Sequence, residues 1–290
     1  MGELSPIGSS GGFGGGSSLA AGAYLIQAEG IYTGYKYYET RYYDSVVDQG
    51  NATGAAGASN GATSWDYEDE VTYTFGHGLS YTTFTQTLDS VDVDLNEKTI
   101  TATVTVQNTG SVAGKHVAQL YVNVPYTEYD KEHGVEKAAI SFLGMEKTDT
   151  LAPGASETLT IVVDAKYMAS WDSSAKDGLG GWILDGGDYH FTVAVGAHAA
   201  VNNVLKAEAY AVDGDADLVI TKRIGSEGSV DETTFAVSDT GVEVVNQLQD
   251  ADVNYYKEDY ATYLSRSNWT GTFPRTYDDL TIDGPKVDEW

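Results

Sequence analysis

The chain of 290 residues holds 16 basic and 43 acidic residues, and its net charge of −27 repels nucleic acids and anionic membranes, which excludes both as partners. It has no cysteine, which excludes disulfides, thiolate nucleophiles and cysteine metal sites. It also lacks a run of about 20 apolar residues that would span a bilayer and the basic start of a signal peptide, so the compartment is not fixed.

The first 70 residues differ in composition from those that follow. Residues 1–23 are rich in Gly, Ser and Ala, which predicts a flexible lead. Residues 24–70 begin with a tyrosine-dense segment, YLIQAEGIYTGYKYYETRYYDSVV, and pass into Gly50–Ser64, a stretch of low complexity that we expect to be loose. The chain therefore begins with a lead and an irregular segment before regular structure starts.

Regular alternation begins near residue 71 and predicts strands. Over Thr99–Gln107, aliphatic residues alternate with threonines, which is the period-2 pattern of a half-buried strand. Val117–Val124 alternates in the same way, and Pro125 ends it. Further strands are predicted at Ser90–Leu95, Ser141–Lys147, Glu157–Asp164 and Tyr189–Val195. Short strands separated by turn residues predict an all-β fold, an immunoglobulin-like β-sandwich over residues 71–212 with irregular N- and C-terminal extensions.

The alternation weakens after Ala197. The segment Ala199–Tyr210 suits either a strand or a short helix, so both stay open. Residues 213–290 are acidic and aromatic, with short strand-like pieces at Leu218–Lys222 and Thr233–Val237. From Val242 the tail shows no clear period, and we expect it to pack on a surface that belongs to another domain.

Several segments resemble, in order, those of one enzyme family. YTFGHGLSYTTF at Tyr73–Phe84 is similar to the phrase that opens the fibronectin type III-like domain of family 3 glycoside hydrolases. Further similar segments are Val104–Gly110 (VTVQNTG), Val117–Val122 (VAQLYV), Phe142–Lys147 (FLGMEK), Leu151–Gly154 (LAPG) and Gly187–Tyr189 (GDY). Glu29–Tyr38 (EGIYTGYKYY) resembles the end of the family's α/β sandwich domain, and Tyr263–Pro274 resembles a connector from a subgroup with permuted domain order. The resemblance implies an α/β remnant at 24–70, a fibronectin type III-like sandwich at 71–212 and a connector at 213–290.

The resemblance also implies a parent enzyme that hydrolyses β-linked glycosides with two carboxyl groups about 5–5.5 Å apart. The family's barrel and most of its α/β sandwich, which carry those groups, have no counterpart here, so no catalytic residue is assigned. We expect a non-catalytic structural module whose partners are the catalytic domains of such an enzyme. Two alternatives stay open: a free-standing carbohydrate-binding module for β-glucan or oligosaccharide, and one half of a split glycoside hydrolase.

Two groups of residues are candidates for contact with carbohydrate or with a partner: Tyr126, Tyr129 and His133, and Tyr35, Tyr37 and Tyr38. The first group lies in the charged stretch Pro125–Lys137, which is predicted to be a loop, and loops often carry function. The second group lies in the tyrosine-dense segment, and aromatic faces of this kind stack on sugar rings. Packing between the sandwich and a missing neighbouring domain explains the second group better than sugar stacking does.

The sequence predicts no metal and no cofactor. Asp213, Asp215 and Asp217 alternate like the start of a calcium loop, but Leu218 and Ile224 stand where that loop needs its glycine and its glutamate. We therefore expect an acidic turn there. The five histidines lack the spacing of a zinc site, and no glycine-rich loop precedes a strand–helix unit that would bind phosphate.

Overall fold

The computed structural model describes residues 27–59, 62–256, 258 and 260–269, together with two short backbone pieces at 5–6 and 24–25. Most of the predicted lead at 1–23 lies outside the described residues. The strands are β1 (Ser5–Pro6), β2 (Tyr24–Leu25), β3 (Phe84–Asp94), β4 (Thr99–Asn108), β5 (Val117–Asn123), β6 (Ser141–Lys147), β7 (Ser156–Asp164), β8 (Ser170–Asp172), β9 (Gly181–Asp185), β10 (Gly187–Ala194), β11 (Val219–Ile224) and β12 (Val230–Asp231). The α-helices are α1 (Tyr35–Val46), α2 (Tyr67–Glu70), α3 (Glu128–His133), α4 (Ala175–Gly178), α5 (Ala197–Ala207) and α6 (Val253–Tyr256). Short 3-10 helices are η2 (Ala165–Met168), η3 (Ala216–Leu218) and η4 (Gln249–Ala251).

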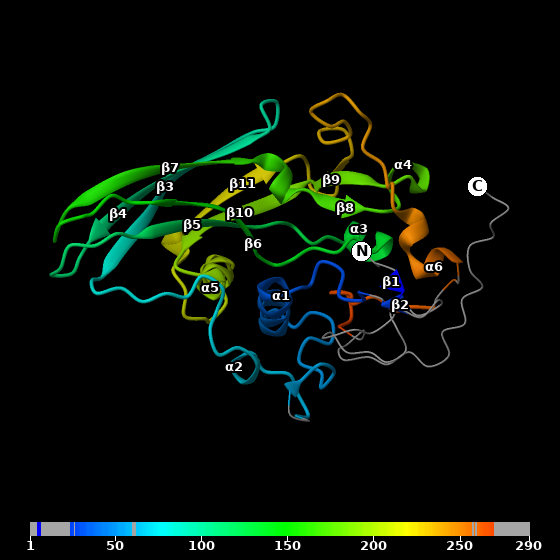
Figure 1. Ribbon diagram of the computed structural model, residues 1–290, viewed down its shortest axis with the longest axis horizontal. Helices are drawn as coiled ribbons and strands as arrows, with labels where there is room; N and C mark the ends of the chain where they lie inside the picture. Colours follow the sequence, from blue (N-terminus) through cyan, green and yellow to red (C-terminus); the bar gives the residue numbers. More distant parts are fainter. Residues whose placement is uncertain are drawn as a thin grey trace.

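Two antiparallel sheets form the sandwich. One has the order β3-β4-β7 and the other the order β11-β10-β5-β6. In the first sheet Ile100 on β4 stands opposite Val93 on β3 and Val163 on β7. The two sheets face each other on the left side of Figure 1. The predicted all-β sandwich is therefore confirmed, with strand bounds within a few residues of those expected for β4, β5, β6, β7 and β10.

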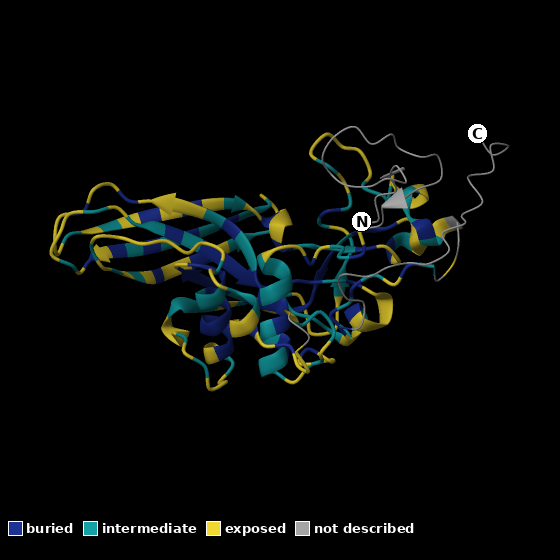
Figure 2. Ribbon diagram, turned by 60° about the horizontal axis from the view of Figure 1, so that its bottom comes forward, coloured by how far each residue is buried: buried dark blue, intermediate teal, exposed yellow. Residues whose placement is uncertain are grey.

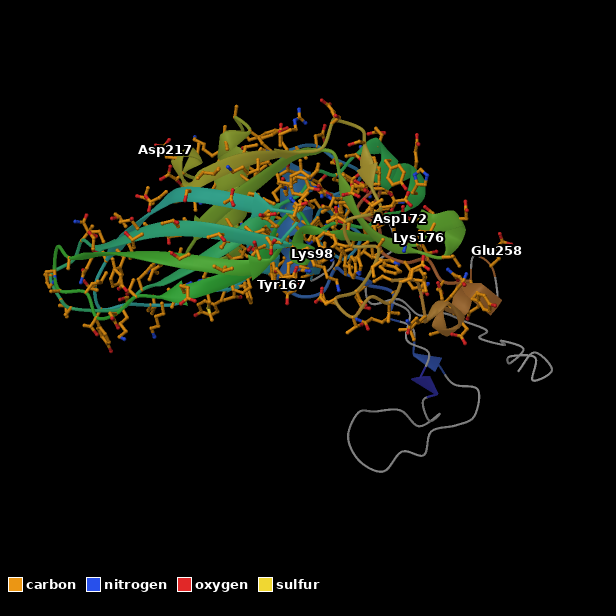
Figure 3. All side chains as sticks on the ribbon, turned by 90° about the horizontal axis from the view of Figure 1, so that it is seen from above. Lys98, Tyr167, Asp172, Lys176, Asp217 and Glu258 are labelled. Atoms are coloured by element: carbon orange, nitrogen blue, oxygen red, sulfur yellow. The ribbon has the colours of Figure 1, made fainter. Side chains whose placement is uncertain are left out.

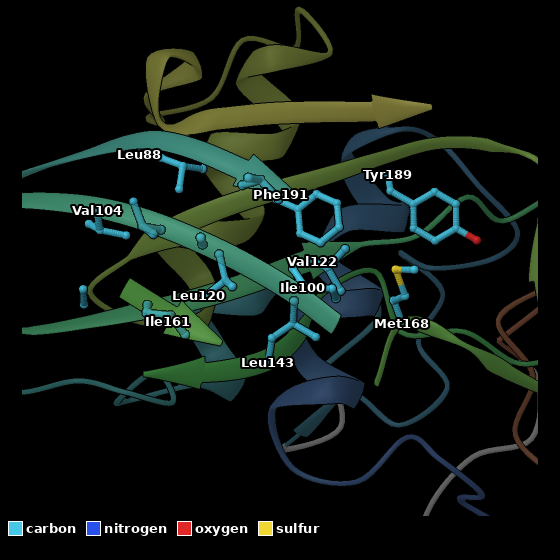
Figure 4. Packing of buried hydrophobic residues seen from close by; sticks show 14 of the residues in the cluster. Leu88, Ile100, Val104, Leu120, Val122, Leu143, Ile161, Met168, Tyr189 and Phe191 are labelled. Carbon is cyan, nitrogen blue, oxygen red and sulfur yellow. The ribbon is translucent and has the colours of Figure 1, made fainter. Parts of the chain in front are cut away.

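The main core lies between these sheets. On β4 the aliphatic side chains of Ile100, Ala102, Val104 and Val106 are completely buried, whereas the threonines between them are half-exposed. They meet a matching layer from the second sheet, shown in Figure 4, whose fully buried members include Leu120, Val122, Phe191 and Val193. Each large aliphatic side chain in such a layer contributes about 1.5–3 kcal/mol on burial, which is ample for one stable domain.

A second core covers the outer face of the four-stranded sheet. Helix α5 carries a stripe of small and aliphatic residues at helical spacing, and Figure 1 shows it beside α1 below β5 and β10. The members of this second core are Tyr121, Ile140, Ala194, Ala197, Ala200, Val201, Val204 and Leu205, with Tyr35, Tyr42 and Val46 of α1 packed against them. This explains why Tyr121 is buried although strand alternation predicts that it faces solvent.

The structure decides one open alternative, corrects one expected strand and adds one sheet. Of the two alternatives for Ala199–Tyr210, the structure shows the helix, α5. The strand expected at Thr233–Val237 is wrong, because that segment forms turns, and Val237 makes one isolated bridge to Glu243. Beside the sandwich lies a further, smaller sheet of order β12-β9-β8. Sequence alternation does not predict this sheet, because strands of two to five residues have too few positions to show a period.

Figure 2 shows how burial is distributed: buried residues line the inside of the sandwich and the body that α1 and α5 build beside it. No helix among the described residues has the length and apolar character needed to cross a lipid bilayer.

Candidate functional site

Helix α1 holds the second group of candidates, Tyr35, Tyr37 and Tyr38, in one place. The ring of Tyr35 stacks on Phe75 with centroids 4.5 Å apart, and its hydroxyl accepts a hydrogen bond from the backbone N–H of Phe142 at 3.0 Å. Tyr37 and Tyr38 follow on the same helix, with their rings edge to face at 5.0 Å. Burial is the main cause that raises the pKa of Tyr35 and of Tyr37 above the ordinary value.

Arg41 organises the segment that follows α1. Its guanidinium is completely buried and donates a hydrogen bond of 2.7 Å to the hydroxyl of Tyr37. Its remaining donors bind three backbone carbonyl oxygens at 2.7 Å each, those of Ala52, Gly54 and Ala56. The expectation that Gly50–Ser64 is loose is therefore wrong for its described part, because one buried cation gathers those carbonyls around itself.

Two shallow hollows lie on either side of Tyr38. One has a volume of about 330 Å³ and the other of about 540 Å³, and Gly34, Tyr38 and Glu70 line both. The first is also lined by Tyr35 and the second by Tyr37. The three candidate tyrosines of α1 therefore border one continuous region of surface.

Residues 266–269 of the tail contact Asp44, near the end of α1. Its carboxylate, completely buried, accepts three hydrogen bonds of 2.8–3.0 Å from the guanidinium of Arg266 and one of 2.9 Å from the indole N–H of Trp269. The tail was expected to pack on another domain, but its described part packs on α1 of this chain. No local pattern could have shown this, because the partners are 222 residues apart.

Tyr126 lies beside this junction. The guanidinium of Arg266 stacks over its ring at 4.6 Å from the centroid, and burial raises the pKa of its hydroxyl. Tyr126, Arg266 and Tyr43 line a third, polar hollow of about 390 Å³ that also includes residues of β10 and β11.

Tyr129 and His133 lie apart from the other candidates and line none of these three hollows. They belong to helix α3, so the predicted loop at Pro125–Lys137 contains a helix instead. Its first turn is closed by a capping box between Thr127 and Asp130. The ring of Tyr129 stacks on that of His133 at 3.9 Å. The structure therefore splits the six predicted residues among three places.

Glu39 forms a second buried cluster that the sequence did not reveal. It accepts hydrogen bonds from the hydroxyl of Tyr67 at 2.5 Å and from Nδ1 of His198 at 2.9 Å. The imidazole of His198 stacks on the Tyr67 ring at 4.1 Å. These contacts join α1, α2 and α5, so Glu39 holds the helices together.

A strip of apolar side chains between α2 and β3 faces solvent. Tyr73 is 73% exposed, Leu79 94% and Tyr81 100%. The backbone of the strip is closely packed at Gly76, at φ +88°, where a Cβ would lie 2.9 Å from the Cα of Gly196. The segment is the cyan thread that links α2 to the sandwich in Figure 1. Exposed apolar side chains gathered in one segment are typical of contact surfaces.

The acidic turn at Asp213–Asp217 is joined to α5, because the backbone N–H of Asp215 donates a hydrogen bond of 2.9 Å to the side chain of Asn203. Asp215 caps η3 by accepting a hydrogen bond from the backbone N–H of Asp217 at 3.0 Å. Figure 3 shows Asp217 beside the sandwich, far from Asp172 and Lys176. Within the part of the chain that the structure describes, no three His, Asp or Glu side chains are gathered as metal ligands would be.

Residues 116–199 match the sequence model of the fibronectin type III-like domain. Beta-glucosidase A of Butyrivibrio fibrisolvens is 35% identical over 58% of this chain and 18% of its own length. A beta-glucosidase of Ruminococcus albus is 33% identical over 57% of this chain and 14% of its own. Among solved structures, a beta-glucosidase from Paenibacillus barengoltzii is 30% identical, covers 59% of this chain and 15% of its own, and superposes with a TM-score of 0.44.

This chain thus spans less than a fifth of the length of the curated relatives it matches. The matched domain model covers β5 to β10 and the start of α5, which is the part of the sandwich that the strand pattern also predicts. The chain therefore carries a fibronectin type III-like domain, and the region that contains it is similar to part of these beta-glucosidases.

Proposed function

We propose that this chain is a non-catalytic structural module of a β-glucosidase-type enzyme, which docks on the catalytic domains and holds them in position. The observation that carries the proposal is the exposed apolar strip of Tyr73, Phe75, Leu79 and Tyr81. It coincides with the phrase that resembles the entry into the family's domain. It also lies next to Tyr35 of α1, since Phe75 stacks on that ring.

The similarity to the beta-glucosidases supports a neighbouring protein domain as the partner. Each contains more than four fifths of its length outside the matched region, so the matched region is one part of a larger protein. A surface of aromatic and aliphatic side chains is costly to leave in water, and docking on a neighbouring domain removes that cost. We also propose that the parent enzyme has the permuted domain order, in which the catalytic barrel follows this sandwich.

The aromatic residues support docking over sugar binding. A sugar ring needs a free aromatic face to stack on. Here Phe75 covers a face of Tyr35, Arg266 covers one of Tyr126, and His133 covers one of Tyr129. These side chains pack against their own chain, as expected for a structural role.

The test uses the double variant Leu79→Ser, Tyr81→Ser. Both side chains are almost fully exposed, so the stability of the chain should change by less than about 0.5 kcal/mol. The partner is Butyrivibrio fibrisolvens β-glucosidase A from which the matching segment has been deleted, added in a calorimetric titration. We expect saturable binding by the unaltered chain and at least tenfold weaker binding by the variant.

The matched control is Val162→Ser, Tyr167→Ser, which removes two other exposed apolar side chains far from the strip. Equal binding by all three proteins, or none by any of them, would contradict docking through the strip. Titration of the unaltered chain with soluble β-glucan separates the main alternative, because a carbohydrate-binding module would give saturable heat there.

A further inference from the structure

A lysine and two aspartates are buried together between α3 and β9. Lys137 is 3% exposed, Asp130 0% and Asp185 2%, so each charged group is removed from water. The ammonium of Lys137 donates to Asp130 at 2.8 Å and contacts Oδ2 of Asp185 directly. Isolated lysine and aspartate side chains are almost never buried this completely, and here three share one site.

The charges in this site do not balance. One ammonium faces two carboxylates, which leaves one surplus negative charge if all three groups are ionised. The guanidinium of Arg266 is paired with Asp44, and it donates a hydrogen bond of 3.3 Å to the backbone oxygen of Lys137. The carboxylate of Glu136 beside it adds negative charge. A buried site with excess negative charge favours holding a proton on one carboxyl group.

The two aspartates differ in how they are held. Asp130 accepts hydrogen bonds from the backbone N–H of Thr127 at 2.6 Å and from its hydroxyl at 3.2 Å, which fixes its carboxyl group beside the amine. Burial raises the pKa of Asp130 above its usual range although Lys137 opposes the shift. Asp185, the last residue of β9, receives one longer bond of 3.3 Å from the Thr127 hydroxyl. Asp130 is thus placed to carry a proton, and Asp185 to react.

We propose that Lys137 and Asp185 condense to an intramolecular amide bond, with Asp130 as the proton carrier. The ammonium passes one proton to Asp130, and the freed electron pair of Nζ attacks Cγ of Asp185, forming the C–N bond. The nitrogen then loses a second proton to one oxygen of the former carboxyl group. Asp130 returns its proton to that same oxygen, the C–O bond breaks, and water leaves.

The balance needs no other reactant: one ammonium and one carboxylate become one amide and one water molecule. In solution this condensation is unfavourable, but two groups held in contact react with effective molarities of about 10⁵–10⁸ M. The surroundings also exclude water, since Val135, Ile183 and Tyr189 around the site are at most 1% exposed. The product would tie the 125–137 segment to β9, and this inference is independent of the docking proposed above.

The test is the mass of the purified, denatured chain. We expect a mass one water molecule below that of the sequence. Trypsin should release peptide 132–147, uncleaved after Lys137, joined to peptide 177–206. The full sequence mass, with the two peptides separate, would overturn the proposal and leave an ionic cluster. Because the measurement is made on unfolded wild-type protein, it does not depend on any variant folding.

Three variants assign the atoms. Lys137→Gln and Asp130→Asn should both restore the full mass, while Lys131→Gln, which alters a lysine on the exposed side of α3, should keep the loss. Asp185 precedes Gly186, and an Asp–Gly pair can lose water as a cyclic imide. A loss of water that persists in Lys137→Gln would therefore overturn the amide.

Discussion

The contact between Asp44 of α1 and Arg266 of the tail gives the sharpest prediction about stability. In Arg266→Met the carboxylate of Asp44 stays completely buried but loses its three guanidinium hydrogen bonds and keeps that of Trp269. Removing one partner of a buried ion pair costs about 3–5 kcal/mol, because the other charge is left uncompensated. We expect a loss of that size in the free energy of unfolding, measured by urea denaturation with circular dichroism.

Two further variants complete the cycle. Asp44→Asn alone should also cost about 3–5 kcal/mol, whereas the double variant should cost clearly less than the sum, with a coupling of about 2–3 kcal/mol. The control is Arg223→Met, which breaks the half-exposed pair of Arg223 with Asp188 at 3.2 Å and should cost less than about 1 kcal/mol. If Arg266→Met costs no more than Arg223→Met, the tail does not dock on α1.

Three other predictions concern the sandwich and its small sheet. Leu120→Ala should lower the free energy of unfolding by about 2–5 kcal/mol, while Val162→Ala, at an exposed position of β7, should change it by less than about 0.5 kcal/mol; similar values would contradict the assigned core. Gly76→Ala should cost more than about 2 kcal/mol, since its Cβ would meet the Gly196 backbone, and more than Gly134→Ala, where the space is open; the reverse order in thermal unfolding would refute the anchoring of the strip. Burial alone would raise the pKa of Asp172, but hydrogen bonds from Tyr129 and Ser174 hold this pKa below its ordinary value. The ionised carboxylate therefore adds stability above about pH 4, and this stability is lost as the pH falls through the folded pKa. Tyr129→Phe should raise that pKa in an NMR titration and lower stability at neutral pH by about 1.5 kcal/mol; an unchanged pKa would show that the bond is not made.

A strand of the sandwich could be predicted where one of its faces enters the core and the other meets solvent. In β4 every second side chain enters the core, so the sequence repeats with the period of the strand. The same reasoning failed for Tyr121, because it assumes that one face of the sheet meets solvent. Helix α5 covers that face, and the residue pattern of the strand alone does not predict that a helix packs there.

Helix α1 could not be predicted from apolar spacing. Its inward side is made of Tyr35, Glu39 and Tyr42, side chains that count as polar in a sequence pattern but are satisfied here by specific partners. The tyrosines of α1 are candidates because of their aromatic faces, and the structure shows that Phe75 occupies one face of Tyr35. Buried ion pairs such as Asp44 with Arg266 depend on the assembled fold, so they leave no local trace.

Hydrolysis of an aryl β-glucoside by the purified chain tests the central claim most directly. If the chain is the non-catalytic module proposed above, it should release the aryl group no faster than buffer alone, at any concentration of the chain. Turnover at enzyme-like rates, proportional to the amount of chain, would mean that this sandwich cuts glycosidic bonds itself.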